Sequence, residues 1–146
     1  MKAAAINDNY RFELSFNEPM VAYPEASAFA AATTVLSNYS FVFSKSAVTD
    51  IDMSVALGTP VSDAATGLAA MNAKSRFNFA AGTVTFDPSN PRTVFVTVAR
   101  TLVPTEAKYF KVRVENAADP AGNTISTSGK VEADDTADNI KFGSLL

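Results

Sequence analysis

The 146-residue sequence contains no histidine, no cysteine and no tryptophan. Without histidine and cysteine, the chain cannot build a Ser-His-Asp triad, a Cys-His pair, a disulfide bond, or a metal site with imidazole or thiolate ligands. Carboxylate and hydroxyl chemistry remain, but no paired acids lie in the apolar surroundings that raise the pKa of a glycosidase general acid. We therefore expect that the protein is not an enzyme.

Charged side chains of both signs are scarce. They make up 18% of the sequence, whereas typical soluble domains contain about 25%. The net charge of −3 at pH 7 argues against binding nucleic acid through its phosphates. A weakly charged surface fits either an ordinary soluble domain or a domain that neighbouring subunits partly cover in an assembly.

Long hydrophobic runs are also missing. The longest weakly polar stretch, residues 26–36, is rich in alanine and interrupted by Ser27, Thr33 and Thr34, so no membrane insertion is expected. Residues 1–9 lack the apolar run of a secretory signal peptide. We expect the cell surface or extracellular space if the chain is cut from a secreted protein, and a virion if it is a complete chain.

A two-residue alternation of apolar and polar side chains dominates the sequence and is typical of strands with one buried face. Turn residues separate the alternating runs, which predict strands over residues 10–16, 38–43, 50–57, 77–79, 84–86, 93–98, 109–115 and 124–131. Alanine-rich stretches predict short helices over residues 26–36 and 64–73.

This pattern predicts an all-β fold, an Ig-like antiparallel β-sandwich of seven or eight strands with short helical excursions. We expect the sandwich to span residues 10–131, with an N-terminal arm at residues 1–9 and a C-terminal tail at residues 132–146. The large apolar residues expected in the core are Phe12, Leu14, Phe41, Val96, Val112 and Val114.

Residues 119–123 have the composition of a tight turn. The Asp119 carboxylate can accept hydrogen bonds from backbone N–H groups two residues on, and Pro120 presets the next backbone dihedral. Gly122 allows a positive φ, and Asn123 can cap the entry into the next strand. We predict a structural corner here in preference to a ligand site.

Several segments together resemble the SbsA-type (Big_5) bacterial Ig-like domains of S-layer and other surface proteins. Residues 12–20 and 38–41 are similar to the opening strands of that family. Residues 93–98, 102–104, 109–114 and 119–123 match, in order, its strand, Leu-x-Pro link, Tyr-led strand and Asp-x-x-Gly-Asn turn. The resemblance covers a little over half of the chain and implies an Ig-like fold with a structural role.

The chain departs from that family in three places. Thr105-Glu106 stands where Gly-Thr is usual, residues 44–76 are longer than the usual middle, and residues 132–146 have no counterpart.

Calcium is the one metal that the composition allows, because it takes oxygen ligands. The candidate ligands are Asp134, Asp135 and Asp138, close to Glu132 in a predicted loop. We expect a solvated acidic tail without a metal in preference to a calcium site. No cofactor is expected.

The end of the chain carries apolar residues behind this acidic stretch, namely Ile140, Phe142, Leu145 and Leu146. They can mediate assembly by docking on a neighbouring subunit or by adding a strand to its sheet edge. The alternative is that the tail folds back onto its own domain.

We therefore expect a non-catalytic structural or interaction module of a surface assembly, S-layer or adhesin-like. One alternative is a virion decoration or tail accessory protein with the same fold, and another is an accessory domain of a secreted hydrolase. The expected partners are other protein subunits, either copies of this chain or a larger assembly.

Overall fold

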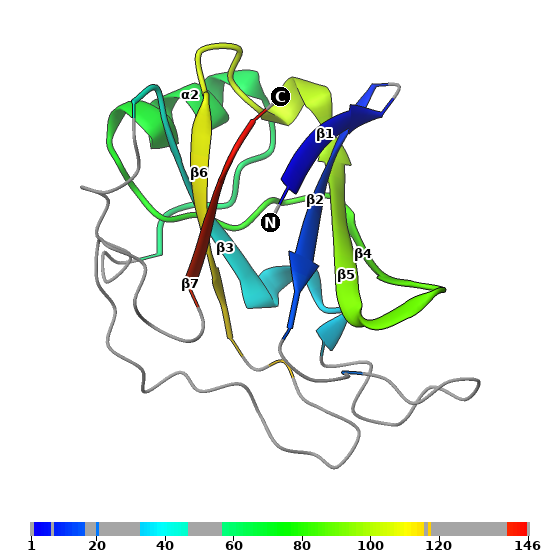
Figure 1. Ribbon diagram of the computed structural model, residues 1–146. Helices are drawn as coiled ribbons and strands as arrows, with labels where there is room; N and C mark the ends of the chain where they lie inside the picture. Colours follow the sequence, from blue (N-terminus) through cyan, green and yellow to red (C-terminus); the bar gives the residue numbers. More distant parts are fainter. Residues whose placement is uncertain are drawn as a thin grey trace.

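The computed structural model describes residues 2–6, 8–16, 20, 33–46, 57–115, 117 and 140–145. In this part of the chain, antiparallel strands form two sheets (Figure 1). The four-stranded sheet consists, in spatial order, of β1 (Lys2–Ile6), β2 (Asn9–Ser15), β5 (Asn90–Ala99) and β4 (Thr83–Asp87). The three-stranded sheet consists of β3 (Tyr39–Ser44), β6 (Tyr109–Val114) and β7 (Ile140–Ser144). The described chain is therefore mostly β, as the alternation predicts.

The predicted strands at residues 10–16, 38–43, 84–86, 93–98 and 109–115 correspond to β2, β3, β4, β5 and β6. Residues 77–79 form isolated bridges instead of a strand, since Phe77 pairs with Phe41 and Phe79 pairs with Val61. The predicted strands at residues 50–57 and 124–131 lie outside the described residues, except that Leu57 forms a bridge with Arg76.

The core lies where the inward faces of the two sheets meet. All six residues predicted for the core are buried. The Phe12 ring of β2 lies 4.9 Å, between centroids, from both Phe41 of β3 and Phe110 of β6, which belong to the other sheet. Residues with period two therefore point inward from both sheets, which is the physical basis of the alternation.

Two segments that the alternation leaves outside the strands belong to the sheets. The expected N-terminal arm contains β1, which pairs with β2 in a register that places Lys2 opposite Glu13 and Ile6 opposite Asn9. Three consecutive alanines hide this strand from a pattern search, because they break the apolar–polar alternation. Only two residues separate β1 from β2, so the hairpin brings the strands together.

The C-terminal segment also folds onto its own chain instead of projecting as a free arm. β7 pairs with β6, placing Ile140 opposite Arg113 and Phe142 opposite Lys111. Leu145 is half-buried and packs against the core, and its backbone N–H donates to the carbonyl oxygen of Lys108 at 2.8 Å. Leu146 lies outside the described residues.

The predicted helix at residues 64–73 is confirmed as α2 (Ala64–Asn72). Asp63 caps its N-terminus in a reciprocal box, in which the Asp63 carboxylate accepts the N–H of Thr66 at 2.8 Å. Hydrogen bonds from Thr66 lower the pKa of Asp63. Short 3₁₀ turns, η1 (Leu36–Asn38) and η3 (Arg100–Leu102), precede β3 and follow β5. Of the predicted helix at residues 26–36, only the last four residues are described.

No helix within the described residues has the length and apolarity needed to cross a membrane.

Replacing Phe12 by alanine is expected to lower the free energy of unfolding by about 3–5 kcal/mol, because the ring fills the centre of the core. Phe95→Ala is the matched control. The Phe95 ring lies on the outer face beneath Arg11, whose guanidinium carbon is 4.3 Å from the ring centroid, so its loss should cost about 1 kcal/mol. Urea denaturation measures both values, and equal losses would contradict the assignment of the two faces.

Candidate functional site

Helix α2 lies close to residues 102–104, the Leu-Val-Pro link, which begins at the last residue of η3. Gly67 allows this approach because it has no side chain. A Cβ atom on Gly67 would lie 2.5 Å from the Leu102 carbonyl oxygen and 3.5 Å from the Pro104 ring. Leu102 and Pro104 are themselves buried. The close contact fixes the position of α2 beside the Leu-Val-Pro link.

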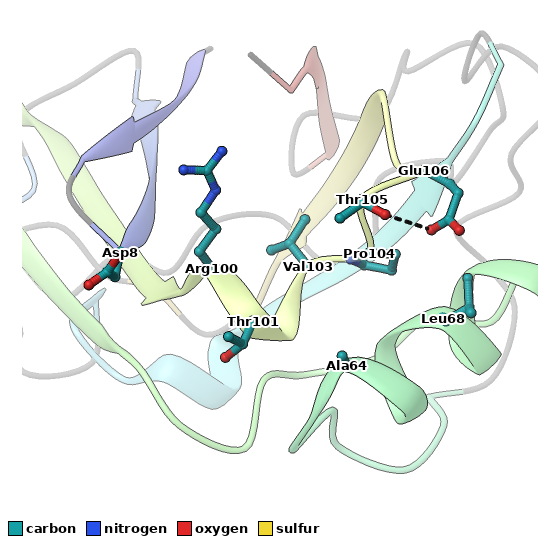
Figure 2. Close-up of a pocket in the computed structure, with 9 residues that line it drawn as sticks. All are labelled: Asp8, Ala64, Leu68, Arg100, Thr101, Val103, Pro104, Thr105 and Glu106. Carbon is teal, nitrogen blue, oxygen red and sulfur yellow. Dashed lines mark hydrogen bonds between the residues drawn. The ribbon is translucent and has the colours of Figure 1, made fainter.

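The two elements form the walls of an open groove of about 690 Å³. Its apolar lining comes from Ala64 and Leu68 of α2 and from Val103 and Pro104 of the link. Figure 2 shows Ala64 and Leu68 on the side of α2 that faces this link. The remaining lining residues are polar: Asp8, Arg100, Thr101, Thr105 and Glu106.

The polar residues form the rim of the groove. The Arg100 side chain extends away from α2 (Figure 2), and its guanidinium carbon lies 5.7 Å from the centroid of the Tyr10 ring. Its backbone N–H donates to the Asp8 carbonyl oxygen at 2.8 Å. The Thr105 hydroxyl donates to the Glu106 carboxylate at 3.3 Å. An apolar floor with charges of both signs at its edge suits the docking of a protein surface.

A second polar feature, the arginine–glutamate cluster, comprises Ser40, Arg76, Arg113 and Glu115. The Arg76 guanidinium donates to the Ser40 hydroxyl at 3.0 Å and to the Glu115 carboxylate at 3.2 Å. The Arg113 Nε lies 3.0 Å from the same carboxylate oxygen, as an ion pair without the angles of a hydrogen bond. The cluster therefore ties the segment before β4 to the outer side of β3 and β6.

One carboxylate serves two guanidinium groups in this cluster. The arginine side chains are 13% and 16% exposed, and that of Glu115 is 32% exposed. Burial, followed by repulsion from Arg113, lowers the pKa of Arg76, and Glu115 partly opposes this shift. The shared carboxylate is what makes it favourable to hold two positive charges side by side.

The structure leaves most of the predicted site residues untested. The turn residues Asp119, Pro120, Gly122 and Asn123 lie outside the described residues. The same holds for the calcium candidates Asp134, Asp135 and Asp138. Among the residues that are described, no three acidic side chains gather as metal ligands would.

The alternation of apolar and polar residues in the sequence does not point to the groove. Its residues come from three separate segments, at Asp8, residues 64–68 and residues 100–106. In the sequence, the Leu-x-Pro link stands out only as a connection between strands. Gly67 was the available signal, since a glycine inside a predicted helix often marks a close approach of another element.

No family model, no curated protein and no solved structure matches the chain. The resemblance to SbsA-type domains therefore depends on the residues of this sequence alone.

Gly67→Ala is expected to destabilise the protein by about 1–3 kcal/mol, because the new methyl group would collide with the Leu102 carbonyl. Helix propensity alone would make the same change stabilise the protein by roughly 1 kcal/mol. The steric effect and the propensity effect therefore differ in sign. The control is Ala69→Gly at an exposed position of α2, with an expected loss of about 1 kcal/mol. Thermal unfolding gives both values, and a stabilised Gly67→Ala variant would refute the close approach.

Glu115→Gln is expected to destabilise the protein by about 1–3 kcal/mol, because it leaves two guanidinium groups facing a neutral amide. The loss should be smaller than for a fully buried pair, since solvent partly screens Glu115. Glu106→Gln, at an exposed carboxylate, should change stability by less than about 0.5 kcal/mol. Urea denaturation compares the two variants, and similar values would rule out a special role for the cluster.

Proposed function

We propose that the chain is an Ig-like β-sandwich that acts as a non-catalytic structural and interaction module of a surface assembly, of the S-layer or adhesin kind. The strand order carries this proposal. Constant-type Ig domains have strands A to G in chain order, arranged as sheets A-B-E-D and C-F-G. The orders β1-β2-β5-β4 and β3-β6-β7 correspond to these strand for strand.

The contacts between the sheets support the same fold. In an Ig domain, inward-facing residues of strands B, C and F meet in the centre of the core. By the correspondence above, these strands are β2, β3 and β6, which supply Phe12, Phe41 and Phe110 to the closest ring contacts between the sheets. The strand order and the positions of these rings both support the proposed fold.

The chemistry of the sequence favours an interaction role over catalysis. No residue of the chain can act as an imidazole base or a thiolate nucleophile, because histidine and cysteine are absent. The carboxylate-bearing residues at the rim of the groove, Asp8 and Glu106, are exposed to solvent. Scaffold domains that present loops and grooves to protein partners need none of this chemistry.

We assign the partner-binding role to the groove between α2 and the link after η3. An apolar side chain of the partner would pack against Leu68 and Pro104, and an acidic residue of the partner would pair with Arg100. Arg100 is suited to this pairing because its side chain is exposed and already oriented by the Tyr10 ring. The partner is a protein of the surface layer in this proposal.

Arg100→Glu tests the proposal in a binding assay with isolated cell envelopes of the source organism. Reversing the rim charge should weaken binding by roughly tenfold and leave the melting temperature nearly unchanged, since the side chain is exposed. The control is Arg92→Glu, an exposed arginine near the start of β5, the strand that ends just before Arg100, and this variant should bind like the wild type. Sedimentation of labelled protein with the envelopes measures the bound fraction.

Two outcomes would contradict the proposal. If the wild-type protein does not sediment with envelopes, the chain is not a module of that surface. If Arg100→Glu and Arg92→Glu weaken binding equally, the protein binds through general charge attraction and the groove is not the site.

A further inference from the structure

Two sheets have four edges, and in the described part of the chain three of them have a neighbour. On the β3 edge, Phe41 exchanges two backbone hydrogen bonds with Phe77, at 2.8 and 3.0 Å. The β1 and β7 edges contact each other and lie side by side in Figure 1. Strand β4 pairs with β5 on one side, and no described residue forms a strand or bridge on its other side.

The hydrogen-bonding pattern identifies the backbone groups at the outer side of β4. Phe16 donates to Arg92, and Arg100 donates to Asp8, so the even-numbered residues of β5 bond toward β2. The odd-numbered residues of β5 must then bond toward β4, where their partners are Thr83 and Thr85. It follows that Val84 and Phe86 direct their N–H and C=O groups outward.

The side chains of this edge lack two of the features that usually prevent strand pairing. Residues 83–86 contain no lysine, no proline and no charge. The one charged residue, Asp87, follows a register shift between Phe86 and Asp87 at the end of the strand. Thr83 and Thr85 expose small hydroxyl side chains on the outer face. Among the described residues, none occupies the outer side of residues 83–86, so this part of the strand can accept a partner strand of matching pattern.

We propose that β4 pairs antiparallel with β4 of a second copy of this chain, about a two-fold axis at Thr85, and joins the two four-stranded sheets into one. Val84 then pairs with Phe86 of the second copy, and Phe86 with Val84, through the outward backbone groups. The two Thr85 residues face each other as a non-hydrogen-bonded pair, in which side chains are closest.

Charge and polarity both favour this partner. Asp87 comes nearest to Thr83 of the second copy, so the two carboxylates do not face each other. Apolar side chains meet on the core face as a β-branched and aromatic pair, and hydroxyl groups meet on the outer face, both of which are favourable across strands. A two-fold contact of this kind closes on itself and gives a discrete dimer.

The test uses charge swapping at Thr85 and sedimentation velocity up to about 1 mM protein. The wild type should dimerise in this range. Thr85→Lys and Thr85→Glu should each be monomeric, because like charges would face each other across the axis. An equimolar mixture of the two variants should dimerise again, since opposite charges would then meet. Asn72→Lys, at an exposed position of α2, adds a charge far from β4 and should dimerise like the wild type.

The proposal is overturned if the wild type stays monomeric, if either single variant dimerises like the wild type, or if mixing does not restore the dimer. Unchanged melting temperatures of the variants show that the fold is intact. The inference extends the proposed function but does not use the groove. Envelope binding by monomeric Thr85→Lys would show that dimerisation and the proposed function are separable.

Discussion

The packing of phenylalanine rings between the two sheets is the interaction on which the rest of the structure depends. Six of these rings are at most 3% exposed: Phe12, Phe41, Phe43, Phe77, Phe79 and Phe110. Phe12 is the one member of this set on the four-stranded sheet, and its ring contacts four of the others. A chain without cysteine has no disulfide to join its sheets, so this apolar contact performs that task.

The segment between β3 and β4 is held on this core at several points and shapes the surface of the molecule. Phe77 and Phe79 enter the core, while Arg76 pairs on the outer side with Glu115. The same segment contains α2, whose close approach through Gly67 creates the groove beside the Leu-Val-Pro link. The proposed partner site is thus a consequence of how an excursion between strands is anchored to the core.

The edges of the two sheets differ in whether they have a neighbour. Because β1 and β7 border each other and Phe77 bridges β3 at Phe41, β4 is the one sheet edge that has no neighbouring strand or bridge among the described residues. In our proposals, the groove and this edge have different partners, a surface protein and a second copy. A module with two such contacts can take part in an extended assembly, because neither contact uses the residues of the other.

The sequence by itself determined the strands in which large apolar residues recur at every second position, because alternation requires no knowledge of their neighbours. Residues of β2, β3, β5 and β6 and the six predicted core positions follow from period two, and α2 follows from its alanine-rich composition. β1 did not follow, since a run of alanines has no alternation and becomes a strand only through pairing with β2. The position of residues 140–144 also did not follow from the sequence, because β7 forms by pairing with the backbone of β6. The groove, the arginine–glutamate cluster and the open side of β4 join residues far apart in the chain, so only the tertiary structure brought them together.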